Sequence, residues 1–305
     1  MQNRSASHRT RTAAAVLTVL PVIAVAALTG CDAERDATTN GPAAEQQRRP
    51  AAPARIWDRS PRSVAVVGDS ITRGFDACSV LADCPEVSWA TGTDSAVRSL
   101  AMRLLGASGA ASRSWNHAET GARIDRLPEQ MALAAEQKPD LVTVMIGAND
   151  ACRDSVKLMT PVADFRASFQ VSMRQLRSRA PKTQVYVSSV PDLKRLWSTG
   201  RGNPLGMQIW KLGICKSMLG RADDMSAEAV ARRTAVQERV VAYNEVLRDV
   251  CAKDRRCRYD GGAVFDYRFT GEQLSPWDWF HPGRNGQARL AEIAYRNVTA
   301  RRPPA

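Results

Sequence analysis

The chain has 305 residues, of which 44% are hydrophobic and 24% are charged, so it can bury the core of one large domain or two small ones. This composition excludes fibrous and collagen-like proteins. The formal net charge is +12, but the arginines are scattered and no basic run is interleaved with aromatic residues, which argues against a nucleic-acid partner. The positive charge would suit anionic lipid or cell-wall polymers, and an arginine-rich composition alone explains it equally well.

Residues 1–30 differ in character from the rest of the chain. Arg4, Arg9 and Arg11 precede the uncharged apolar run Ala13–Leu28, which contains Pro21. The run is shorter than the ~20 residues that a membrane span needs. A basic start followed by a short apolar segment predicts a signal peptide.

The apolar run ends in "LTGC", Leu28 to Cys31, which resembles the bacterial lipobox. The resemblance implies cleavage before Cys31 and a diacylglycerol on its sulfur, which would anchor the protein to the outer face of the cell membrane. The alternative is an ordinary signal peptide cut nearby, with Cys31 left as a free thiol. The segment that follows is rich in alanine, proline and charge, which is typical of a flexible linker. The predicted organisation is a signal peptide over 1–30, a lipid-anchored linker over 31–60, one folded domain over 61–300 and a tail over 301–305.

The cysteine count also favours export. The six cysteines besides Cys31 are Cys78, Cys84, Cys152, Cys215, Cys251 and Cys257. An even number outside the cytoplasm predicts three disulfides. Local spacing favours the pairs Cys78–Cys84 and Cys251–Cys257, which leaves Cys152–Cys215. A zinc site is the competing interpretation, but no pair has the two-residue zinc spacing and histidines are few, so no metal is expected.

Apolar runs alternate with amphipathic segments along the rest of the chain. The runs predict buried strands over residues 64–67, 140–147 and 183–190. Helices are predicted over residues 94–105, 127–137, 161–180, 226–250 and 285–299, and an irregular loop over 191–221. Strands that alternate with helices favour a parallel sheet covered on both faces, and hence a three-layer α/β/α sandwich.

Polar residues follow the first two strands at once. Gly68, Asp69 and Ser70 come directly after the first strand, and "GAND", Gly147 to Asp150, follows the second. Because sites in parallel sheets form at the carboxyl ends of strands, these residues are expected to share one edge. A serine there needs a base, and His281 has Asp278 three residues before it, which would fix the imidazole tautomer. A loop with a helix-capping role is the alternative for Asp278 and His281 alone.

Four short blocks together resemble the SGNH, or GDSL, hydrolase family. They are "GDSI" at Gly68–Ile71, "NHAETG" at Asn116–Gly121, "GAND" at Gly147–Asp150 and "DWFH" at Asp278–His281, in the family's order over about residues 62–300. A cysteine soon after the asparagine, in "IGANDAC", is most similar to the esterase, lipase and phospholipase branch. The resemblance implies a flavodoxin-like α/β/α fold with a central parallel sheet and no cofactor.

The resemblance also implies a role for each matching residue. Ser70 would attack an acyl carbonyl, His281 would take its proton, and Asp278 would orient His281. Some family members use a backbone carbonyl in place of this acid. The oxyanion hole would comprise the backbone N–H groups of Ser70 and Gly121 and the side-chain amide of Asn149.

The sequence therefore predicts an exported, monomeric serine hydrolase that cleaves carboxylic esters, those of lipids or fatty acids first. Removal of acetyl groups from a cell-surface polysaccharide is the alternative within the same chemistry. A non-catalytic binding lipoprotein that keeps the fold is the alternative from another class, and it would be expected to have a broken triad.

Overall fold

A parallel sheet with fully buried central strands forms the centre of the fold. The computed structural model describes residues 57–304, so the predicted signal peptide, the lipidated Cys31 and most of the predicted linker lie outside the described residues. Within the described part, the sheet has five strands in the order β2-β1-β3-β4-β5, all parallel. The strands are β1 (Val64–Gly68), β2 (Ser114–Asn116), β3 (Leu141–Met145), β4 (Gln184–Val187) and β5 (Cys257–Tyr259).

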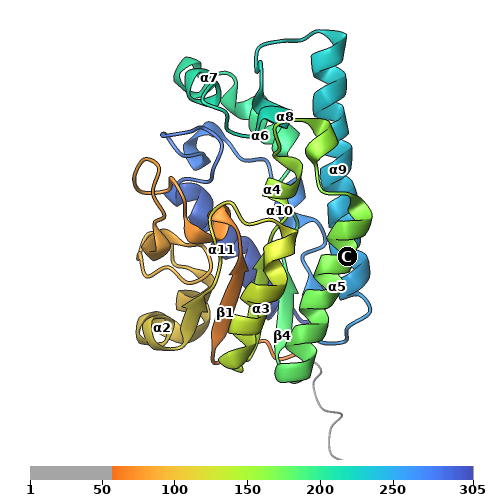
Figure 1. Cartoon of the computed structure of the whole chain (residues 1–305). Helices are drawn as coiled ribbons and strands as arrows, with labels where there is room; N and C mark the ends of the chain where they lie inside the picture. The colour runs from red at the N-terminus through yellow and green to blue at the C-terminus, as the bar shows by residue number, and fades with distance from the viewer. Residues whose placement is uncertain (1–56, 305) are drawn as a thin grey trace, which may run out of the picture. The chain divides into compact units, whose positions relative to one another are not determined.

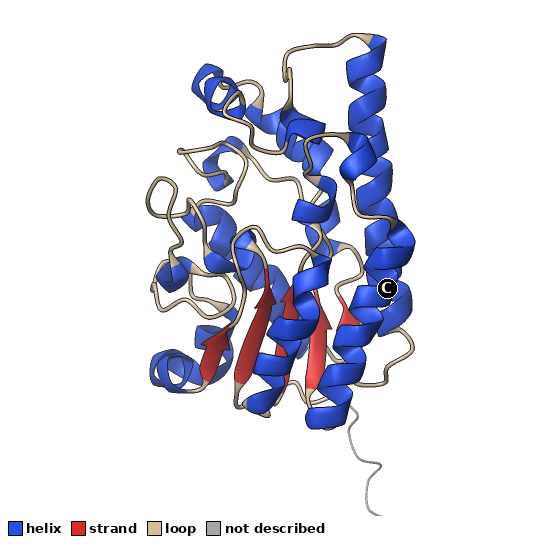
Figure 2. Cartoon of the chain, in the orientation of Figure 1, coloured by secondary structure: helices blue, strands red, loops and turns tan. Residues whose placement is uncertain are grey.

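Helices cover both faces of this sheet, as Figures 1 and 2 show. The helices α3 (Leu127–Glu136), α5 (Val162–Arg179) and α9 (Ala227–Cys251) pack side by side on one face. The helices α2 (Leu100–Ser112) and α11 (Arg284–Thr299) pack together on the other. This arrangement confirms the predicted α/β/α sandwich.

The shorter elements lie in the connections. They are the helices α1 (Ser70–Arg73), α4 (Ala148–Ala151), α6 (Leu193–Gly200), α7 (Pro204–Trp210), α8 (Lys216–Leu219) and α10 (Ala263–Asp266) and the 3-10 turns η1 (Pro85–Val87), η2 (Ile124–Arg126), η3 (Val156–Leu158) and η4 (Gly271–Gln273). Several of them follow the carboxyl ends of strands, so they build the edge on which the polar blocks meet.

Two predicted segments differ from the structure. The helix expected from residue 94 begins at Leu100, because Arg98 has a left-handed backbone (φ 48°) and Ser99 caps the helix by accepting a hydrogen bond from the N–H of Met102. The irregular loop expected over 191–221 contains α6, α7 and α8. The tryptophan side chains of this segment are buried and hydrogen-bonded, and these tertiary contacts hold helices that are each too short to be stable alone.

Three disulfides brace the loops. They join Cys78 to Cys84, Cys152 to Cys215, and Cys251 to Cys257, which is the pairing that local spacing favours. The second ties the end of α4 to the start of α8 across a sequence separation of 63 residues. Among residues 57–304, no helix has the length and apolar character needed to cross a membrane.

The first residues that the structure describes contact the folded domain. The indole N–H of Trp57 donates to the carbonyl of Val298, and the backbone N–H of Asp58 donates to the side chain of Gln184. Residues 57 and 58 therefore pack on the domain, just before the expected boundary at 61.

Candidate active site

Ser70 lies where β1 turns into α1. Gly68 ends the strand with a φ of 154°, and a Cβ there would stand 2.3 Å from the carbonyl oxygen of Met145, so only glycine fits. Asp69 then caps α1 by accepting a hydrogen bond from the N–H of Ile71 at 3.0 Å. The tight turn and the cap place Ser70 in the first turn of a short helix at the sheet edge.

The structure brings Ser70, His281 and Asp278 together. The Oγ of Ser70 lies 3.0 Å from the Nε2 of His281, and the Nδ1 of His281 contacts the Oδ2 of Asp278. The other carboxylate oxygen, Oδ1, accepts hydrogen bonds from the backbone N–H groups of Phe280 and His281, both at 2.9 Å. Asp278 is only 1% exposed. A buried carboxylate fixed at both oxygens can hold the imidazole in one tautomer, with Nε2 free to accept the serine proton.

Electrostatics favour a positive charge on His281. Burial alone would lower the pKa of His281, but the negative charges of Asp278, Asp76 and Asp69 outweigh it, so that the pKa lies above its usual value. Burial would raise the pKa of Asp278, but the attraction to His281 and the hydrogen bonds at Oδ1 outweigh it and lower the pKa. Asp278 is therefore ionised at neutral pH, and His281 is a stronger base than a free imidazole.

Two buried glutamines hold the turn that carries Ser70, and neither belongs to a recognisable sequence motif. Gln287 of α11 donates to the carbonyl of Ile71 at 2.9 Å and accepts from the N–H of Trp89 at 2.9 Å, which ties α11 to α1. Gln130 of α3 exchanges two hydrogen bonds with the backbone of Gly68, at 2.8 and 3.0 Å. These side chains lock the turn that carries the serine.

The predicted oxyanion residues lie on neighbouring segments. Asn149 belongs to α4, after β3, and its Nδ2 donates to the carbonyl of Ala122 at 3.0 Å. Gly121 has a φ of 82° and is exposed, and no other atom lies within 4 Å of where a Cβ would stand. Within residues 57–304, one hydrogen bond thus joins Asn149 to Ala122, next to Gly121, and no hydrogen bond joins Asn149 or Gly121 to Ser70.

An amide at position 149 is expected to matter for the rate. One Nδ2 proton is engaged by Ala122, so in the predicted role the other would donate to the oxyanion. Replacing Asn149 with alanine should lower kcat by about 10²–10³-fold, with little change in KM, because such a donor acts mainly in the transition state. Steady-state kinetics on a p-nitrophenyl ester would measure this. Asn297→Ala, at the far end of α11, is the matched control, and a loss below tenfold at position 149 would contradict the role.

The protein has an α/β/α fold, and Ser70, His281 and Asp278 meet at the edge of its sheet. This arrangement of serine, histidine and aspartate is like that of serine hydrolases. The chain belongs to the GDSL-like Lipase/Acylhydrolase family, whose model matches residues 66–289. It is therefore an enzyme of the carboxylic ester hydrolase type. A comparison with curated proteins finds no match.

Solved structures of related hydrolases are similar to this chain at low identity. An extracellular lipase from Streptomyces rimosus is 19% identical over 78% of this chain and 99% of its own, with a TM-score of 0.41. Phospholipase A1 from Streptomyces albidoflavus NA297 is 19% identical over 79% and 100%, with a TM-score of 0.41. A family two carbohydrate esterase from Clostridium thermocellum is 15% identical over 78% and 63%, with a TM-score of 0.46.

Proposed function

We propose that the protein is an exported serine hydrolase that cleaves carboxylic esters of lipids or fatty-acyl chains. The observation that supports this most directly is the 3.0 Å contact between the Oγ of Ser70 and the Nε2 of His281, with Asp278 on the opposite ring nitrogen. A serine hydroxyl is a weak nucleophile unless an adjacent base takes its proton. This geometry supplies the base and its orienting acid.

The proposed reaction has two steps. In the first, the Oγ of Ser70 attacks the acyl carbonyl while the Nε2 of His281 takes the hydroxyl proton, and Asp278 stabilises the resulting imidazolium. The backbone N–H groups of Ser70 and Gly121 and the amide of Asn149 stabilise the oxyanion. His281 then protonates the leaving alcohol, and an acyl-enzyme remains on Ser70. In the second step, water attacks that ester with His281 again as base, which releases the acid and restores the serine.

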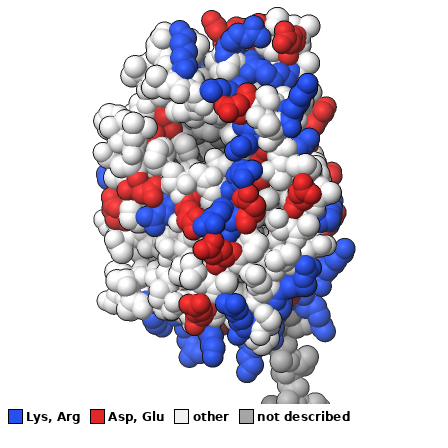
Figure 3. All heavy atoms as spheres, in the orientation of Figure 1, with Lys and Arg blue, Asp and Glu red and all other residues white. Residues whose placement is uncertain are grey.

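Apolar side chains near the site support an acyl-chain substrate. Figure 3 shows a hollow in the face of the molecule, close to the α6–α8 helices of Figure 1. Of these helices, α7 contacts the segment that carries His281, because Trp210 donates to the carbonyl of Asp278 at 2.7 Å and a Cβ on Gly206 would stand 2.8 Å from Trp279. Large apolar residues that are exposed include Leu205 and Leu212 in the α6–α8 segment and Trp277 directly before Asp278. Exposed apolar side chains on segments that contact the His281 segment would suit a hydrocarbon chain of the substrate.

An exported, membrane-tethered location fits the same proposal. Three disulfides favour an oxidising compartment. The lipobox-like sequence at Cys31 and the linker up to residue 60 would hold the domain 61–300 near a membrane, within reach of lipid esters.

The experiment that tests this function is a chain-length profile. The full chain, made in an oxidising compartment, would be assayed with p-nitrophenyl esters from acetyl to palmitoyl. Cleavage of medium and long chains is expected. Cleavage of the acetyl ester alone would favour removal of O-acetyl groups from a polysaccharide instead. No cleavage by a folded protein would favour a binding lipoprotein instead.

A further inference from the structure

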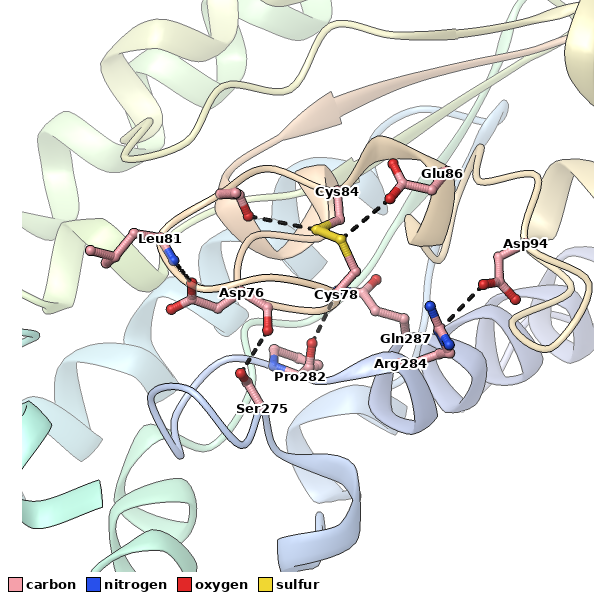
Figure 4. Close-up of a disulfide and its surroundings, with 11 residues drawn as sticks. Asp76, Cys78, Leu81, Cys84, Glu86, Asp94, Ser275, Pro282, Arg284 and Gln287 are labelled. Carbon is pink, nitrogen blue, oxygen red and sulfur yellow. Dashed lines mark hydrogen bonds and ion pairs between the residues drawn. A yellow bond between two sulfur atoms is a disulfide. The ribbon is translucent and has the colours of Figure 1, made fainter. Parts of the chain in front are cut away.

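A second buried carboxyl lies beside the Asp278–His281 pair. Asp76 follows α1, two residues before the loop that the Cys78–Cys84 disulfide closes, and it is 1% exposed (Figure 4). Its backbone is left-handed (φ 55°), and its Oδ1 accepts a hydrogen bond from the N–H of Leu81 at 2.5 Å. The disulfide loop therefore folds around this side chain and fixes where it stands.

The same residue contacts the segment that carries the catalytic base. The hydroxyl of Ser275 donates to the carbonyl of Asp76 at 2.6 Å, as Figure 4 shows. One side-chain ligand atom from each of Asp76, Asp278 and His281 lies within 4.8 Å of the others. An aspartate needed only to close its own loop would not have to point its carboxyl group at the Asp278–His281 pair.

We propose that Asp76 is a positioning residue of this site, a second carboxylate that stabilises the positive charge formed on His281 when Ser70 loses its proton. This role rests on the proposed ester hydrolysis and deepens it. The residue acts through His281 and need not touch the substrate. The attraction between the Asp76 carboxylate and a positive His281 is stronger in a site shielded from water than it would be at the same separation in bulk solvent.

The charges around Asp76 agree with this role. Burial, followed by repulsion from Asp278, raises the pKa of Asp76 to about 6, so it is ionised at pH 7 and above. The remaining acid that faces His281 is Asp69, whose pKa burial raises to about 7. The charged groups of the adjoining segments form ion pairs of their own, Arg73 with Asp83 at 3.0 Å and Arg284 with Asp94 at 3.3 Å.

The test compares the pH profiles of wild type and Asp76→Asn. The amide keeps an oxygen for the N–H of Leu81 but removes the negative charge. His281 should then lose its proton at lower pH, so the acid limb of kcat/KM should move to lower pH by on the order of one pH unit. The plateau kcat should fall by roughly three- to tenfold because a less basic imidazole is a weaker general base, while KM changes little.

A measurement without substrate separates this idea from the proposed function. The imidazole of His281 can be titrated by NMR in wild type and Asp76→Asn, and the same downward shift is expected even if no ester is cleaved. Glu86→Gln removes a charge from an exposed position in η1, directly after the Cys78–Cys84 loop, and is the matched control, expected to shift neither profile. If Asp76→Asn does not fold, Asp76→Ser offers a smaller neutral acceptor to Leu81.

Two results would overturn the proposal. One is an unchanged His281 titration in a folded Asp76 variant, which would leave Asp76 as a loop-closing residue only. The other is loss of wild-type activity in EDTA, which would mean that the three side chains hold a cation. Absence of ester hydrolysis with an intact His281 shift would instead count against the substrate class alone.

Discussion

Replacing Ser70 with alanine should lower kcat/KM for p-nitrophenyl esters by about 10⁴-fold or more, to the level left by binding and the oxyanion donors. The Oγ that lies 3.0 Å from the Nε2 of His281 is the heavy atom lost, and among residues 57–304 no other side chain is hydrogen-bonded to that nitrogen. The measurement is initial-rate kinetics on the chain length that the wild type prefers.

The fold should survive this change. Asp69, not Ser70, caps α1, and Gln287 still holds the carbonyl of Ile71. The variant should therefore keep the wild-type melting temperature within a few degrees. Ser178→Ala, at an exposed serine of α5, is the matched control and should keep full activity. A Ser70→Ala protein that retains a tenth of the wild-type rate would remove Ser70 as the nucleophile.

The sequence predicted the central part of this fold well, for a physical reason. Strands buried on both faces, such as β1 and β3, are continuous apolar runs, and α5 and α9 are long enough for their amphipathic pattern to be read. The edge strands were missed. Ser114–Asn116 and Cys257–Tyr259 have three residues each, and they pair because β1 and β4 present free backbone groups, not because of their own composition.

The segment of α6, α7 and α8 was missed for a related reason. These helices are short, with glycines at positions 200, 202, 206 and 213, so local propensity does not favour them. Long-range contacts hold them, including the Cys152–Cys215 disulfide and the hydrogen bond of Trp210 to the segment of His281. Such contacts are not visible in a window of sequence.

The residues of the candidate site also fall into those that the sequence reveals and those that only the structure reveals. Ser70, Asp278 and His281 could be named because blocks of fixed order carry them, and the structure brings the three together. Asp76 and Gln287 could not, because each is a single polar residue whose importance depends on which distant segment packs against it. Residues that hold the site residues in position are generally brought there by tertiary packing, so a structure is needed to find them.

Replacing Asp278 with asparagine should lower kcat by about 10⁴-fold while the protein remains folded. The amide oxygen can still accept from the backbone N–H groups of Phe280 and His281, as Oδ1 does now. The amide NH₂ would then face Nδ1 of His281, so that Nδ1 must accept a hydrogen bond and the ring proton moves to Nε2. An Nε2–H directed at Ser70 cannot take the serine proton. Initial rates on the plateau above the acid limb of the wild-type pH profile would measure the loss.

The matched control is the same exchange at another buried aspartate. Asp260 accepts from the hydroxyl of Ser189 at 2.8 Å and from the N–H groups of Gly262 and Val264, so it supports the start of α10 and not the reaction. Asp260→Asn should lower the melting temperature and leave kcat of the folded protein near wild type. Asp278→Asn should do the reverse. If its kcat stayed within tenfold of wild type, Asp278 would not be the group that orients His281, and a backbone carbonyl would have to take that role.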